Sequence, residues 1–128
     1  MNREEINDLS YKIIGAALEV HRILGPGLLE NTYRVALMYE LHQRGLSAKT
    51  EVEIPFLYKG VMLDRGYRAD LIVEDEVILE LKSTENNNPL YFKQLLTYLR
   101  LSNKKLGLLI NFNRKKVSEG IERVVNGL

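Results

Sequence analysis

The sequence of 128 residues contains no cysteine. It can therefore form no disulfide framework, no thiolate zinc site and no cysteine nucleophile. Its two histidines, His21 and His42, are too few and too far apart for a zinc cluster. No apolar run approaches the roughly 20 residues that a membrane-spanning helix needs. The N-terminal segment MNREEIND is acidic, which argues against a secretory signal, so we expect a cytoplasmic protein with no membrane partner.

The length suits a single domain, residues 1–128, with one core. The formal net charge is only +1, but its distribution is uneven. Residues 1–85 contain ten Lys/Arg and fifteen Asp/Glu, whereas residues 86–128 contain eight and two. This asymmetry is compatible with a polyanion such as nucleic acid along one side, and equally with an ordinary solvated surface. The candidate nucleic-acid-binding residues are Lys93, Arg100, Lys104, Lys105, Arg114, Lys115 and Lys116.

Hydrophobic spacing predicts one α/β domain in which helices flank a mixed β-sheet. The expected element order is α, α, β, β, β, β, α, β, α. A capping box of Asn2 and Glu5 begins the first helix, and Asn88-Pro89 begins the third. The expected helices cover residues 2–24, about 28–44, about 89–101 and 117–125; the expected strands cover residues 51–57, 61–63, 66–73, 77–82 and 106–112.

Three details of this prediction can be tested directly. In the second helix we expect Leu29, Val35 or Ala36, and Tyr39 to face the core. Pro55 lacks a backbone donor and predicts that its strand lies at a sheet edge. The tripeptide Asp64-Arg65-Gly66 predicts a turn between two short strands.

The segment GYRADLIVEDEVILELK, residues 66–82, predicts a tight antiparallel hairpin. Side chains alternate along a strand, so Glu80 and Lys82 share one face. If Val73 pairs with Val77, then Asp70 lies opposite Glu80 on that same face. Two opposed carboxylates repel each other, and a divalent cation between them would remove the repulsion.

Simpler interpretations remain open for these residues. Glu80 and Lys82 could form an ordinary ion pair on a solvated face, and Asp70 could pair with Arg68 or Lys82. Convergence favours a site, because Glu30, Gln94 and Tyr98 could approach it from helices. Oxygen ligands without sulfur or imidazole indicate Mg²⁺ or Mn²⁺. A lysine beside such a cation can orient or deprotonate a water for in-line attack on phosphorus.

These motifs resemble those of the PD-(D/E)xK nuclease superfamily. The resemblance rests on Tyr67-Arg68-Ala69-Asp70, on Glu80-Leu81-Lys82, and on the Q-x-x-x-Y helix of Gln94 to Tyr98. Gly27-Leu28-Leu29-Glu30-Asn31-Thr32-Tyr33 is similar to the signature of the GxxExxY family, and Gly107 to Phe112 resembles that family's late strand. The resemblance covers about residues 13–125 and implies a restriction-endonuclease-like core.

The resemblance also implies residue roles. Asp70, Glu80 and the main-chain carbonyl of Leu81 would ligate Mg²⁺ or Mn²⁺, with Glu30 as a further ligand directly or through water. Lys82 would position or activate the attacking water. Gln94 and Tyr98 would hold Lys82, the water or a substrate phosphate. Relatives often carry His-Glu where this chain has Tyr91-Phe92.

The function implied is metal-dependent hydrolysis of nucleic acid, with DNA as the favoured substrate. The alternative is a catalytically weak or inactive nuclease-fold module that binds nucleic acid or a protein partner. A homodimer or a larger assembly is compatible with either hypothesis.

Overall fold

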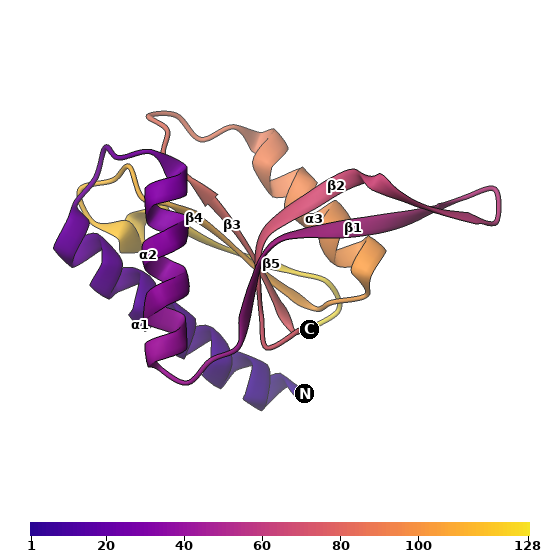
Figure 1. Cartoon of the computed structure of the whole chain (residues 1–128), viewed down its shortest axis with the longest axis horizontal. Helices are drawn as coiled ribbons and strands as arrows, with labels where there is room; N and C mark the ends of the chain where they lie inside the picture. Colours follow the sequence, from indigo (N-terminus) through magenta and orange to yellow (C-terminus); the bar gives the residue numbers. More distant parts are fainter.

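A five-stranded mixed sheet lies between two layers of helices in the computed structural model, which describes residues 1–128 (Figure 1). The strand order is β1-β2-β3-β4-β5. Only β3 and β4 run parallel, since α3 connects them; every other neighbouring pair is antiparallel. The elements are α1 (Arg3–Leu24), α2 (Glu30–Gln43), β1 (Ala48–Tyr58), β2 (Val61–Val73), β3 (Val77–Lys82), α3 (Pro89–Ser102), β4 (Leu106–Asn111), a 3₁₀ turn η1 (Val117–Gly120) and β5 (Ile121–Val125).

Each face of the sheet has its own core. The face towards α1 and α2 buries 21 residues in one cluster, and alternate residues of β3 contribute Val77, Leu79 and Leu81 to it. The other face packs on α3 through Ile78 and neighbours. This alternation is the one predicted for residues 77–82, and it places Glu80 on the α3 face.

The helix boundaries follow the expected capping chemistry. The capping box predicted for Asn2 and Glu5 is confirmed, and so is the Asn88 cap, whose side chain accepts a hydrogen bond from the N–H of Leu90. Of the residues predicted for the core face of α2, Ala36 is partly buried against the core, whereas the prediction was wrong for Leu29, Val35 and Tyr39, which are exposed. None of the helices combines the length and apolarity needed to cross a membrane.

The actual core face of α2 carries Tyr33, Leu37 and Leu41, spaced four residues apart. Tyr33 stacks on Phe112 with ring centroids 4.4 Å apart. Its hydroxyl donates to the carbonyl of Gly25 and accepts from the N–H of Leu28. Tyr33 therefore connects the turn between α1 and α2 to the core. Because its buried side chain also forms these two hydrogen bonds, hydrophobic spacing alone did not identify the core face of α2.

Two other predicted elements were wrong. The residues of the expected turn, Asp64-Arg65-Gly66, lie inside the continuous strand β2, where the register with β1 shifts between Ile54 and Phe56. They form a bulge, which uses the same residue types as a turn. The expected helix at 117–125 is instead η1 followed by β5, which pairs antiparallel with β4. The edge position of β1 is confirmed.

Candidate active site

The candidate site lies where β2 separates from β3. The ladder between these strands pairs Val73 with Val77 and ends at the pair Leu71–Leu79. The predicted register is thereby confirmed, and the next residues, Asp70 and Glu80, face each other beyond the end of this ladder, while Glu80 pairs with Leu109 on its other side, in β4. Asp70 is also unpaired in the ladder between β1 and β2, which pairs Thr50 with Leu71 and then Val52 with Ala69. Glu51, the residue of β1 opposite Asp70, has a φ of 49° and leaves the extended conformation.

Carboxylates replace the missing ladder hydrogen bonds. One oxygen of Glu80 accepts from the backbone N–H of Asp70 at 3.2 Å, and one oxygen of Asp70 accepts from the backbone N–H of Leu81 at 2.8 Å. Each acidic side chain is thus fixed by the backbone of the opposite strand, which holds the two carboxyl groups together on the α3 face of the sheet.

The electrostatics of this pair are unusual. Glu80 is 5% exposed, and its burial, together with the neighbouring Asp70 carboxylate, raises its pKa to about 9. Burial, followed by the charge of Glu80, raises the pKa of Tyr98 to about 12. The ion pairs of the structure include neither carboxylate. At neutral pH the pair therefore keeps a proton in place of a second negative charge, and no cationic side chain is bound to it.

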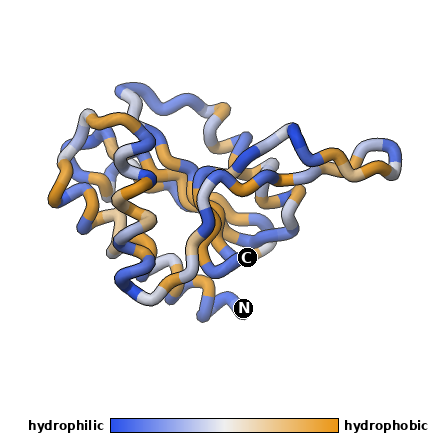
Figure 2. The backbone as a smooth tube through the Cα atoms, viewed as in Figure 1, coloured by the Kyte–Doolittle hydropathy of each residue, from blue (hydrophilic) through white to orange (hydrophobic).

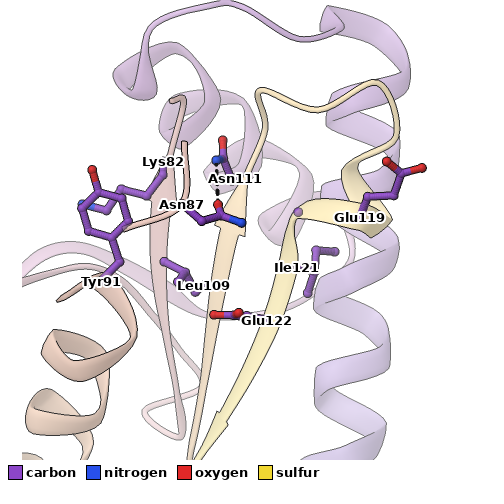
Figure 3. Close-up of a pocket in the computed structure, with 9 residues that line it drawn as sticks. Lys82, Asn87, Tyr91, Leu109, Asn111, Glu119, Ile121 and Glu122 are labelled. Atoms are coloured by element: carbon purple, nitrogen blue, oxygen red, sulfur yellow. Dashed lines mark hydrogen bonds between the residues drawn. The ribbon is translucent and has the colours of Figure 1, made fainter. Parts of the chain in front are cut away.

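Lys82 is the last residue of β3, and its side chain extends towards Tyr91 on α3. Its ammonium nitrogen lies 4.4 Å from the centroid of the Tyr91 ring, a cation–π contact. Figure 3 shows this contact at the edge of a small cavity of about 40 Å³, with Asn87 and Asn111 on the other side of Lys82. Asp70 raises the pKa of Glu80 more than Lys82 lowers it, and Lys82 forms an ion pair with neither carboxylate.

A strand pair that presents Asp-x₉-Glu-x-Lys at the point where the strands part is the arrangement that the motif of one nuclease superfamily describes. The profile of the PD-(D/E)XK nuclease superfamily matches residues 7–124. The chain belongs to this superfamily.

A solved structure with the same fold supports the architecture. The chain is similar to the protein of "Crystal structure of SSO0001", with a TM-score of 0.57 and 22% sequence identity. The match covers 77% of this chain and 50% of that one, so the chain spans about half the length of that protein. No curated protein matches the sequence.

Gln94 and Tyr98, the pair predicted to approach the site from a helix, both lie on α3. Tyr98 is buried, and its ring packs edge-on against Tyr67 with centroids 5.5 Å apart. Gln94, one turn earlier, is exposed and lines a surface hollow of about 430 Å³ together with Tyr67 and Tyr91. The structure thus brings Tyr98 to the carboxylates and leaves Gln94 at the solvent side.

Glu30, like Gln94, is a predicted site residue that the structure does not bring into the cluster of carboxylates. It is exposed at the first position of α2, and no three acidic, histidine or cysteine side chains of the chain lie close enough to share a metal ion. Its helix is nevertheless tied to the site end of the sheet, because the Ser83 hydroxyl donates to the carbonyl of Leu28. The turn before α2 therefore sits beside the residue that follows Lys82.

The basic residues of the C-terminal third do not gather in one place. The Lys104 ammonium binds Asp75 in the β2–β3 turn at 3.1 Å, at the opposite end of β3 from Lys82. Arg114 donates to the carbonyl of Thr84 and to the side chain of Asn87. The other basic side chains are exposed: Lys93 and Arg100 on α3, Lys105 before β4, Lys115 and Lys116 after it, and Arg123 on β5.

Two groups near the site were not recognised from the sequence. Tyr91, which contacts Lys82, was noted from the sequence only as part of the Tyr91-Phe92 pair that stands where relatives often carry His-Glu. Asn111 is 3% exposed and binds both the Thr84 backbone and the Asn87 side chain. These bonds hold the polar segment 83–88, which joins Lys82 to α3. The run of asparagines at 86–88 was the available signal, since such residues fix loops by side-chain hydrogen bonds.

Proposed function

We propose that this protein is a nuclease that hydrolyses phosphodiester bonds of nucleic acid, with DNA as the favoured substrate, and that it depends on Mg²⁺ or Mn²⁺. The observation that carries the proposal is the opposition of Asp70 and Glu80 where β2 and β3 separate, with Lys82 following on the same strand. The Gly27–Tyr33 segment further supports placement in the GxxExxY branch of the superfamily.

The chemistry of the donor set fits a hard divalent cation. Both side chains offer oxygen, and each has one oxygen outside the backbone hydrogen bonds described above. The crowding of negative charge that raises the pKa of Glu80 is relieved when a cation, in place of a proton, neutralises the pair. Asp70, Glu80 and the carbonyl of Leu81 would hold the ion, with Glu30 available from α2.

The other residues near the carboxylate pair would have separate roles in hydrolysis. A bound cation would supply Lewis-acid activation of the phosphate and of the attacking water. After leaving the Tyr91 ring, the Lys82 ammonium would bind a phosphate oxygen, or, once it has lost its own proton, the neutral amine would accept a proton from the water. Tyr98 remains protonated at neutral pH and can donate its phenolic hydrogen towards the carboxylates. Gln94, at the hollow beside Tyr67, would contact the substrate backbone.

Cleavage assays test the proposal directly. Labelled single- and double-stranded DNA and RNA would be incubated with the pure protein in Mg²⁺, Mn²⁺ or EDTA. We expect metal-dependent cleavage that Lys82→Ala and Asp70→Asn each reduce by about 100-fold or more. Lys12→Ala, which removes an exposed lysine of α1, provides the matched control. Cleavage that is equal in the wild type and in Lys82→Ala would exclude the proposed site.

A second candidate function is binding without cleavage. The contact of Lys82 with Tyr91 favours it, because a lysine held on a ring is not positioned for proton transfer at the carboxylates. Titration calorimetry distinguishes the two functions. Mg²⁺ or Mn²⁺ binding that Asp70→Asn abolishes supports the nuclease, whereas nucleic-acid binding without any metal binding supports the module.

A further inference from the structure

A hollow of about 430 Å³ opens between β2 and α3, on the side of the sheet that carries the carboxylate pair. β1 and β2 extend beyond the end of β3 as a two-stranded ribbon (Figure 1), and Tyr67 lies at the base of this ribbon. Residues 64–68 of β2 are exposed, and this part of the strand is hydrophilic (Figure 2). The hollow is therefore part of the solvated surface and not a defect in the packing of the core.

Tyr67 presents a fixed aromatic ring to this hollow. The ring meets Phe56 and Tyr98 edge-on, with centroids 6.0 Å and 5.5 Å away, yet Tyr67 remains 37% exposed. The opposite wall is formed by α3 and its cap, through Asn88, Leu90, Tyr91, Lys93, Gln94 and Thr97. A ring that neighbouring side chains already hold in place loses little conformational freedom when a flat ligand stacks on it.

The polar groups at the hollow indicate the chemistry of its ligand. Lys93 supplies a positive charge that no ion pair of the structure neutralises, and neither Asp nor Glu lines the hollow. Gln94 adds an amide that can both donate and accept hydrogen bonds. An aromatic ring with a cation and an amide beside it suits a flat heterocycle joined to phosphate, which is the composition of a nucleotide.

Both walls of the hollow contact residues of the candidate active site. Tyr67 packs against Tyr98, which is buried beside the carboxylate pair. Tyr91, on the other wall, holds the Lys82 ammonium. A base in the hollow and a phosphate at the carboxylates would therefore be neighbours on one strand.

We propose that the hollow holds an unpaired nucleobase stacked on Tyr67, so that the substrate is a single-stranded segment of nucleic acid. A base inside a duplex stacks on its own neighbours and has to leave the helix before it can enter such a hollow. The scattered basic side chains favour the same substrate class, because binding a duplex through its backbone needs several phosphate contacts together. The inference rests on the proposed function, since it takes nucleic acid as the substrate.

Oligonucleotides with and without bases test the proposal on the unchanged protein. Fluorescence anisotropy would compare a twelve-residue oligothymidylate, an abasic strand of equal length, and the duplex of oligothymidylate with oligoadenylate. Ca²⁺ would replace Mg²⁺, and gel electrophoresis would check that the strands stay intact. We expect oligothymidylate to bind at least about tenfold more tightly than either other ligand. Equal dissociation constants for oligothymidylate and either of them, or no binding of oligothymidylate, would overturn the proposal.

Variants of Tyr67 locate the stacking surface. Tyr67→Leu should weaken the binding of oligothymidylate by about tenfold and leave that of the abasic strand unchanged. Tyr67→Phe, which keeps the ring, should restore the affinity of the wild type. Tyr39→Leu is the matched control, because Tyr39 is 63% exposed on α2, away from the hollow. Equal affinities of Tyr67→Leu and Tyr39→Leu for oligothymidylate would overturn the proposal.

This proposal and the proposed nuclease activity fail in different ways. Base-dependent binding that Tyr67→Leu weakens, without any metal-dependent cleavage, would support stacking and refute the nuclease. Cleavage of duplex and single strand at equal rates, unchanged in Tyr67→Leu, would support the nuclease and overturn stacking.

Discussion

Replacing Glu80 with glutamine should stabilise the metal-free protein at neutral and alkaline pH. The pKa of Glu80 is raised from 4.5 in the unfolded chain to about 9 in the fold. The stability that its proton contributes is complete below pH 4.5 and is lost as the pH rises towards 9, because the unfolded chain releases the proton first. At pH 7 this linkage costs the wild type about 3 kcal/mol, at about 1.4 kcal/mol per pH unit.

Glutamine has nearly the same shape and no proton to release. Its carbonyl oxygen can accept from the N–H of Asp70 as Glu80 does, and its amide can donate to the Asp70 carboxylate. Urea unfolding at several pH values between 5 and 9, followed by circular dichroism, would measure the difference. We expect the advantage of Glu80→Gln to grow steadily with pH, with unchanged m-values.

Divalent cations should reverse the order of stability and make the wild type more stable than Glu80→Gln. Mg²⁺ or Mn²⁺ binds the ionised pair and stabilises the wild type, whereas Glu80→Gln loses a ligand and gains little. Glu122→Gln, at an exposed position of β5, is the matched control, and the stabilisation by Glu80→Gln at high pH should exceed any change that this variant shows. If the difference in the free energy of unfolding between Glu80→Gln and the wild type stays constant from pH 5 to 9, the inference that Asp70 and Glu80 form a buried, coupled carboxylate pair is refuted.

Three further outcomes follow from the contacts described above. Tyr91→Leu should change the pH profile of cleavage by releasing Lys82, whereas Tyr91→Phe keeps the ring and should behave as the wild type; equal profiles for both would remove Tyr91 from any positioning role. Tyr33→Phe should lower the free energy of unfolding by about 1–3 kcal/mol, measured in urea, because the hydroxyl bridges Gly25 and Leu28; an unchanged value would show that water replaces it. Gly120→Ala should destabilise the fold in thermal unfolding by more than an alanine at the exposed Ser118, because a Cβ at Gly120 would lie 2.2 Å from the Asn111 carbonyl oxygen.

The register of the central hairpin could be predicted because it depends on local alternation. Once Val73 faces Val77, the positions of Asp70 and Glu80 follow from the two-residue period of a strand. The same holds for the caps at Asn2 and Asn88, which act within one helical turn. These features need no information from distant parts of the chain.

The features that could not be predicted depend on distant partners. Val117, Ile121 and Val124 have helical spacing, yet the open edge of β4 recruits residues 121–125 as a strand, and β-branched side chains suit that role. β2 was predicted as two strands, because Asp64-Arg65-Gly66 has the composition of a turn. These residues instead form a bulge in β2, which can be recognised only from the pairing of β2 with β1. The contact of Lys82 with Tyr91 joins two elements across a loop, so no spacing rule reveals it.

The uninterrupted course of β2 has a mechanical consequence. The thirteen residues of β2 form one continuous strand from Val61 to Val73, and Asp70 is joined to β3 by carboxylate hydrogen bonds in place of a ladder pair. A load applied to the outer end of β2 is therefore transmitted along one extended segment to the hydrogen bonds between Asp70, Glu80 and Leu81. A molecule that grips this protein by its projecting ribbon holds, by the same strand, one wall of the site.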